Sequence, residues 1–389
     1  MDGRSKKLEK TRRIDLILLQ WNHAPTFRGD KLEDFWTQRF STERDILLIM
    51  GQGFDPRMNT MAHILRKARG KGKRCIKLIH FERKLGYKGS NCNRVEKNFK
   101  ELNELASQWA EIEKKQIYSL DAFDNFVGDY KALQMANSLM PDVQNYSDII
   151  ADLGALPTYI SYPLIAQLIR RLGIDTKLNI HISTGVEQKL DDRIQQAPAT
   201  TRYLAGFESN LRLDGKESLP KIWVPILGPN RIPALDKLKD VIKPTEICPV
   251  LPFPSEEPRR PDMILKEYFE LIFERWEVEP TDIFFASELG PLDVYRRLIR
   301  LHRHYQEALQ PLCYGLGKTR TVVSPLCSKL LSIGVLLAAI EEGENGFGIA
   351  HAFGGGHSQL KPNEIMQNIS VEDMVQYQQS VWVTGEPYQ

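Results

Sequence analysis

The second half of the chain repeats the plan of the first half, with almost no direct sequence identity. In the first half an apolar run at 45–50 ends in a glycine-bearing loop at 51–57, and in the second half a run at 221–227 ends in a loop at 228–233. Further apolar runs and amphipathic stretches follow in the same order, at a nearly constant offset of about 170 residues. The pattern predicts two domains of one fold, related by internal duplication.

Each repeat alternates short apolar runs with longer amphipathic stretches. The runs at 46–49 and 283–286 are apolar throughout, which is typical of strands that helices cover on both faces. Between the runs, apolar residues such as Leu102, Leu105 and Trp109 lie three or four positions apart, as in surface helices. The sequence therefore predicts an α/β protein with two tandem doubly wound, Rossmann-like parallel-sheet domains.

The domain boundaries follow from the polar stretches around the repeats. We expect an N-terminal extension over residues 1–40 and a first Rossmann-like domain over 41–210. A linker-like segment precedes the second Rossmann-like domain, over 219–353, and a Gly-, Gln- and Asn-rich C-terminal tail covers 354–389.

Composition limits the classes of partner and site. The 389 residues are too many for one ordinary core, and no apolar run reaches the roughly 18 residues of a membrane span. The five cysteines are scattered without a Cys-x-x-Cys pair, which favours a reducing compartment, and we expect a cytoplasmic protein. A net charge of +2 makes a nucleic-acid partner unlikely. No metal site and no cofactor are expected.

Four loops follow the first and fourth predicted strands of the two repeats. They are 51–57 and 152–158 in the first half, and 228–233 and 324–329 in the second. Ligands of open parallel sheets bind outside the carboxyl ends of the strands, where glycine allows close approach and a helix N-terminus attracts anions. We therefore expect the ligand to be bound by Gly51, Gly53, Arg57, Gly228, Asn230, Arg231, Ser324, Ser328 and Lys329.

These residue types suit a phosphorylated ligand. The glycines allow the backbone to approach it, Arg57, Arg231 and Lys329 supply positive charge, and the serines supply hydrogen bonds. A dinucleotide fingerprint is not complete, because Asp55 or Pro56 stands where its third glycine would be. The P-loop and nucleophile-elbow motifs are absent from the sequence.

Acidic residues leave a catalytic alternative open. Asp55 and Asp152 end the first and fourth predicted strands and could act as an acid/base pair, with Glu288 as a third candidate. Helix capping is the simpler explanation for the two aspartates. His351 and His357 flank three glycines and could hold a metal, but no acid or cysteine completes the set, so a plain loop is expected.

The units around 152–158 and 324–329 resemble the late signature of CARF-type Rossmann domains, which sense cyclic oligonucleotides. In that signature a strand ends in a small-residue loop with a terminal Thr/Ser-Lys before a helix, and Ser328-Lys329 matches this ending. The Gly-Gly of the signature is missing from both copies. The resemblance implies a fused pair that binds a two-fold ligand across its junction, in a bacterial antiviral defence assembly.

The preferred interpretation is a regulatory sensor that holds a nucleotide or other phosphorylated ligand, or a protein partner, between the two halves. One alternative is an enzyme with an inter-domain active site, such as a nucleotide-sugar transferase or a nucleotide hydrolase. Another is a scaffold subunit or homo-oligomer, for which exposed Trp36, Trp276 and Trp382 would serve. The sequence leaves the question of turnover open.

Overall fold

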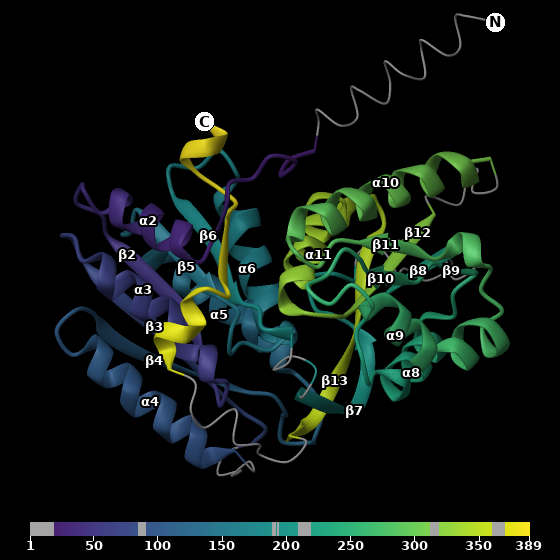
Figure 1. Ribbon diagram of the computed structural model, residues 1–389, viewed down its shortest axis with the longest axis horizontal. Helices are drawn as coiled ribbons and strands as arrows, with labels where there is room; N and C mark the ends of the chain where they lie inside the picture. Colours follow the sequence, from purple (N-terminus) through teal and green to yellow (C-terminus); the bar gives the residue numbers. More distant parts are fainter. Residues whose placement is uncertain are drawn as a thin grey trace, which may run out of the picture.

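The computed structural model describes residues 19–84, 91–188, 192, 194–208, 219–311, 319–359 and 370–389, and for 194–199 and 355–359 it describes the backbone alone. Two sheets lie side by side with helices between and around them (Figure 1). The first sheet has the strand order β1–β14–β6–β5–β2–β3–β4. Its strands are β1 (Thr26–Arg28), β2 (Ile46–Gln52), β3 (Arg74–Glu82), β4 (Glu111–Tyr118), β5 (Asp148–Asp152), β6 (Asn179–Gly185) and β14 (Gln378–Trp382).

The second sheet has the order β11–β10–β8–β12–β13–β7, with β9 pairing beside β8. A Cys-Pro step at 248–249 separates the short strands β9 and β10, where the sequence suggests one continuous strand. The strands are β7 (Ile194–Tyr203), β8 (Lys221–Leu227), β9 (Glu246–Ile247), β10 (Val250–Pro252), β11 (Phe284–Ala286), β12 (Arg320–Leu326) and β13 (Phe347–Gln359).

The two sheets are mixed but mostly parallel. Strands β2 to β6 pair in parallel, and so do β8 and β10 to β13, while β14 and β7 add antiparallel strands at one side of each sheet. The predicted α/β fold with doubly wound parallel sheets is confirmed. Counted along the chain, the parallel strands of both sheets have the order 3-2-1-4-5. Because this order is common among such folds, the internal duplication stays a prediction.

Helices cover both faces of each sheet. The longer helices are α2 (Asp30–Arg39), α3 (Thr60–Ala68), α4 (Cys92–Ala106), α5 (Gly128–Val143), α6 (Thr158–Leu172), α8 (Ile232–Ile242), α9 (Arg260–Glu267), α10 (Pro291–Leu309) and α11 (Lys329–Glu341). The short ones are α12 (Val371–Val375), the 3-10 turns η1 (Pro56–Asn59), η4 (Pro280–Asp282), η5 (Gly343–Asn345) and η7 (Glu386–Tyr388), and the π-helical turn η3 (Glu270–Arg275).

One hydrophobic core joins the two halves. It contains alternate residues of the central strands, such as Leu47 and Val224, together with the apolar faces of α5, α6, α10 and α11. Outer clusters cover the far face of each sheet, with Leu48 beneath α2 and α3 in the first and Trp223 beneath α8 and α9 in the second. Strand β2 is buried on both faces, as its apolar run predicts. The shared core fixes the two sheets relative to each other.

The chain crosses between the sheets near each predicted boundary. Residues 194–203, expected in the first domain, form β7, which pairs antiparallel with β13 of the second sheet. Residues 378–382, expected in the C-terminal tail, form β14, which pairs with β6 and β1 of the first sheet. Part of the expected N-terminal extension also belongs to the first sheet, as β1 and α2. The boundaries as such stay a prediction.

Two sequence-based expectations are corrected. Trp36, Trp276 and Trp382 are not exposed: 8% or less of each is accessible, because they pack into the outer faces of the two sheets. The segment around His351 is not a loop, because it continues β13 past the three glycines. None of the described helices is both long and apolar enough to cross a membrane.

Candidate functional site

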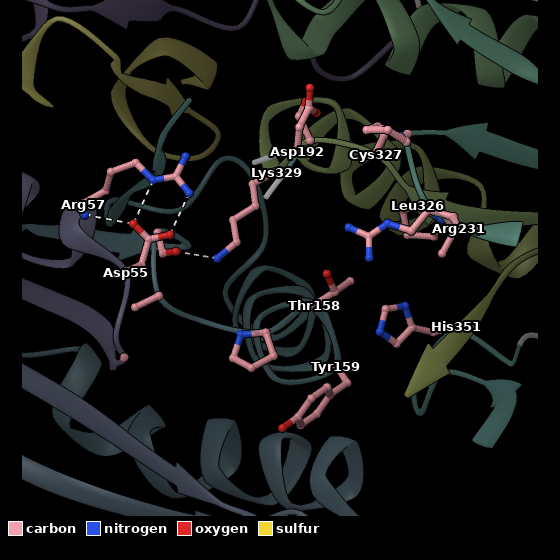
Figure 2. Close-up of a pocket in the computed structure, with 18 of the residues that line it drawn as sticks. Asp55, Arg57, Thr158, Tyr159, Asp192, Arg231, Leu326, Cys327, Lys329 and His351 are labelled. Atoms are coloured by element: carbon pink, nitrogen blue, oxygen red, sulfur yellow. Dashed lines mark hydrogen bonds and ion pairs between the residues drawn. The ribbon is translucent and has the colours of Figure 1, made fainter. Parts of the chain in front are cut away.

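A cavity of about 170 Å³ lies between the carboxyl ends of the two sheets (Figure 2). The first half contributes the loop after β2, the end of β3 and the loop between β5 and α6; the second contributes the loops after β8 and β12, the start of α9 and one residue of β13. The residues are Gly53, Phe54, Asp55, Arg57, Phe81, Gly154, Ala155, Pro157, Thr158, Tyr159, Asp192, Gly228, Pro229, Arg231, Arg260, Pro325, Leu326, Cys327, Ser328, Lys329 and His351.

Glycines allow the strand-end loops to touch. A Cβ on Gly228 would lie 2.5 Å from the carbonyl oxygen of Leu326, and a Cβ on Gly53 would lie 2.9 Å from the Cβ of Ala155. In each half, therefore, the loop after the first parallel strand packs directly on the loop after the fourth. This is the topological switch point at which open parallel sheets bind ligands.

Arg57 is held by Asp55 rather than pointing freely into the cavity. Its Nη2 and Nε lie 2.6 and 2.9 Å from the two carboxylate oxygens, and its Nη1 donates to the carbonyl of Gly185 at 3.2 Å. Only 1% of Arg57 is accessible. Burial alone would raise the pKa of Asp55, but the ion pair with Arg57 outweighs it and the pKa is lowered. The pair is a fixed, charge-compensated part of the wall.

Lys329, at the start of α11, reaches across to the first half. Its Nζ donates to the carbonyl oxygens of Leu153 at 2.5 Å and Leu156 at 3.2 Å, and also to that of Gly154. Figure 2 shows the Lys329 side chain extending toward Asp55. These three carbonyls belong to the loop between β5 and α6. The ammonium group of the second half thus holds a cavity loop of the first half in place.

Arg231 and His351 face the N-terminus of α6. Figure 2 shows the guanidinium of Arg231 and the imidazole of His351 pointing toward Thr158, the first residue of that helix. Only 6% of His351 is accessible. Burial lowers its pKa to about 4, helped by the charges of Arg231 and Arg202 and opposed by Asp129, so the ring is neutral near pH 7.

Arg260 adds a cation that the sequence did not suggest. It binds Asp192 through two hydrogen bonds, at 2.8 and 2.9 Å, and its Nε lies 2.8 Å from Glu288. Burial opposes its charge, but these two carboxylates more than offset this and raise the pKa of Arg260. Its place after β10, at the carboxyl edge of the second sheet, is the signal that could have found it.

The structure brings part of the predicted ligand set together. Gly53, Arg57, Gly228, Arg231, Ser328 and Lys329 line the cavity. Three others do not line it and have structural roles of their own. The hydroxyl of Ser324 accepts a hydrogen bond from Trp223 at 3.0 Å, Asn230 takes a left-handed turn conformation (φ 61°), and Gly51 permits close packing on Leu156. Sequence reasoning missed Phe54, Phe81, Tyr159 and Arg260 as cavity residues. It gave no ligand role to Thr158 and considered His351 only for a metal.

The three acidic candidates do not form one set. Asp55 pairs with Arg57, and Glu288 pairs with Arg260 in the other half. Asp152 accepts a hydrogen bond from the Gly154 N–H at 2.8 Å and lies behind the cavity wall rather than on it. Burial raises its pKa to about 7, partly offset by that hydrogen bond and by the charge of Lys329. The negative charge of Asp55 adds to this rise in the pKa of Asp152, so the two carboxyl groups are close enough to interact, and the acid/base pair stays a prediction.

Within the described residues, no three His, Cys, Asp or Glu side chains gather in a way that could hold a metal ion. The side chain of His357, considered as a partner of His351, lies outside the described residues.

No protein-family model and no curated protein sequence matches the chain. Among solved structures, the chain is similar to a universal stress protein from Archaeoglobus fulgidus, with 12% identity over 79% of this chain and 96% of that protein. The TM-score is 0.22, too low to support an inference about function. The resemblance to CARF-type domains stays a prediction.

Proposed function

We propose that the protein binds a nucleotide or other phosphorylated small molecule in the cavity between its halves, and acts as a regulatory sensor of that ligand. The observation that carries the proposal is the convergence of strand-end loops from both sheets on one cavity with a cationic lining. Among the described lining residues, four are cationic, namely Arg57, Arg231, Arg260 and Lys329, and two are acidic, namely Asp55 and Asp192.

The helix ends favour an anion in the same cavity. The first residues of α6 and α11 line it, so the partial positive charge at both helix N-termini is directed there. Ser328 already caps α11 by accepting a hydrogen bond from Leu331, whereas no side chain caps α6 in the part of the chain described. A ligand phosphate would take the place of that missing cap.

The lining also suits the organic part of a nucleotide. Phe54, Phe81 and Tyr159 add aromatic surface to the first-half wall. Ligand pockets typically combine apolar and aromatic surface with a few convergent polar groups. Because one ligand would contact strand-end loops of both halves, its binding would favour one arrangement of these loops, and such a preference is the physical requirement for a sensor.

The proposal predicts that a nucleotide stabilises the folded protein and that Arg231 is needed for this. A ligand at one hundred times its dissociation constant stabilises by about 2.7 kcal/mol, which corresponds to a rise in Tm of roughly 3 °C for a chain of this size. The assay is a thermal-shift screen with mono-, di- and cyclic nucleotides, cyclic oligonucleotides and inorganic phosphate. Arg231→Ala should reduce the shift by at least half.

The matched control is Arg275→Ala. Arg275 is an exposed arginine that pairs with Asp236 and does not line the cavity, so its loss should leave the shift unchanged. The proposal fails if no nucleotide or phosphate shifts the parent protein, or if Arg231→Ala responds like the parent. Consumption of a bound nucleotide, measured by chromatography, would favour the enzyme alternative instead.

A further inference from the structure

We propose that the N-terminus of α6 is a phosphate subsite, at which Thr158, Arg231 and His351 hold the terminal phosphate group of a phosphomonoester. This inference rests on the proposed function, because it assigns a place and a chemical class to the ligand of the same cavity. In this subsite His351 recognises the phosphate group of the ligand.

The first observation is the uncapped start of α6. The helix has 15 residues, and its N-cap is Pro157, which carries no side-chain hydrogen bond to the first turn. The carbonyl oxygen of Pro157 accepts hydrogen bonds from the N–H groups of Ile160 and Ser161, which are the first N–H groups that it can reach. The N–H groups of Thr158 and Tyr159 cannot be satisfied inside the helix, and both residues line the cavity.

The second observation is independent and concerns His351, on the opposite wall. Its Nδ1 is buried and has no hydrogen-bond partner within the described part of the chain. The ring of Phe353 packs edge-to-face against the imidazole, with the two ring centroids 5.1 Å apart and an interplanar angle of 87°. The imidazole points into the cavity toward Thr158 (Figure 2). A buried polar atom without a partner costs free energy, and a bound ligand would remove this cost.

The number of converging groups indicates the type of phosphate. The hydroxyl of Thr158, the guanidinium of Arg231, the imidazole of His351 and the N–H groups that open α6 face one region. A terminal phosphate offers three acceptor oxygens to such a set, whereas a phosphodiester has two non-bridging oxygens. The subsite therefore favours a phosphomonoester over a cyclic nucleotide.

Binding at this subsite should be linked to proton uptake. The charged groups that face His351 are Asp129 of α5, Arg202 of β7 and Arg231, while Tyr159 of α6, whose pKa burial raises to about 12, stays neutral. In the free protein the imidazole is neutral, because burial lowers its pKa to about 4. An adjacent dianion raises that pKa, so the complex takes up a proton and affinity rises as pH falls.

The test measures the affinity of 5′-AMP by calorimetry between pH 5.5 and 8, for the parent and for His351→Gln. Glutamine keeps a hydrogen-bonding group but cannot take up the proton. Comparing the two proteins at each pH cancels the titration of the phosphate itself. We expect the ratio of parent to variant affinity to grow as pH falls, by at most tenfold per pH unit, and to reach at least fivefold at pH 5.5.

The control variant is His63→Gln, on α3, since His63 does not line the cavity. Its affinity for 5′-AMP should equal that of the parent at every pH. The preference for a monoester is tested by comparing the affinities of the parent for 5′-AMP and for 3′,5′-cyclic AMP. We expect 5′-AMP to bind at least tenfold more tightly. Equal affinity for the two nucleotides, or a parent-to-variant ratio that does not change with pH, overturns the subsite.

Thr158→Val decides the question if His351→Gln does not fold. It removes one hydroxyl with little change of shape, and should weaken 5′-AMP binding at least threefold with an unchanged Tm in the absence of ligand. Unchanged binding overturns the subsite. If 5′-AMP, 3′,5′-cyclic AMP and inorganic phosphate all fail to bind the parent, the subsite fails, and the proposed function fails with it if no nucleotide of the thermal-shift screen binds either. If the three ligands bind without these dependences, only the subsite fails.

Discussion

The ion pair between Asp129 and Arg202 should be among the costliest contacts to break in this protein. Asp129 lies at the start of α5 in the first half, and Arg202 lies on β7 of the second sheet. The guanidinium of Arg202 binds both carboxylate oxygens, at 2.6 and 2.7 Å, and Asp129 also accepts from the Ala205 N–H at 3.0 Å. The change to test is Asp129→Asn.

The structure sets the expected magnitude. Asp129 is fully buried, while 21% of the Arg202 side chain is accessible. Removing one partner of a buried pair costs roughly 3–5 kcal/mol, because it leaves the other charge uncompensated. The partial exposure of Arg202 lets water replace some of the lost contact, so we expect about 3 kcal/mol. Arg202 also lies over the ring of Phe353, at 4.6 Å, so its displacement should disturb the neighbourhood of His351.

The assay is urea unfolding of the parent, Asp129→Asn, Arg202→Met and the double variant. A double-mutant cycle should give a coupling above about 1.5 kcal/mol, since the two side chains contact each other directly. The control is Asp236→Asn, which breaks an exposed pair with Arg275 and should cost at most about 1 kcal/mol. A loss below 1 kcal/mol in Asp129→Asn would refute the conclusion that this contact fixes β7 against the first half.

Two further predictions concern the cavity. Lys329→Met removes the hydrogen bonds to the carbonyls of Leu153, Gly154 and Leu156 and should cost about 2–3 kcal/mol in urea unfolding; unchanged stability would contradict the cross-domain role of Lys329. Because burial raises the pKa of Asp152 to about 7, the folded protein keeps a proton there that the unfolded chain loses above about pH 4. Asp152 therefore lowers stability as pH rises from 4 to 7, and Asp152→Asn should gain up to roughly 4 kcal/mol relative to the parent between pH 4 and 8. Parallel pH profiles of the two unfolding free energies would refute this.

Local patterns explain what was predictable from the sequence. Continuous apolar runs such as 46–49 can be buried on both faces only in a sheet that helices cover, so they indicated the parallel sheets that the structure shows. A glycine after such a run marks the turn into a helix at the carboxyl end of the strand. The positions of Gly53 and Gly228 on the cavity wall follow from this rule.

Pairing over long distances could not be predicted in the same way. Strand β14 lies nearly 200 residues from its partner β6, and β7 joins a sheet whose other strands come later in the chain. Their own residues specify an extended strand but not which edge it joins. That choice depends on which sheet edge is accessible once the rest of each sheet has assembled.

The sequence by itself determined the α/β class, the strand-end loops and the cationic residue types that these loops carry. Only the tertiary structure decided how each charge is used: Asp55 holds Arg57, Lys329 binds carbonyls across the junction, and Arg231 meets His351 at the start of α6. The physical reason is range. Burial and backbone conformation are specified over a few neighbouring residues, whereas the partner of a charged side chain depends on segments that only folding brings together.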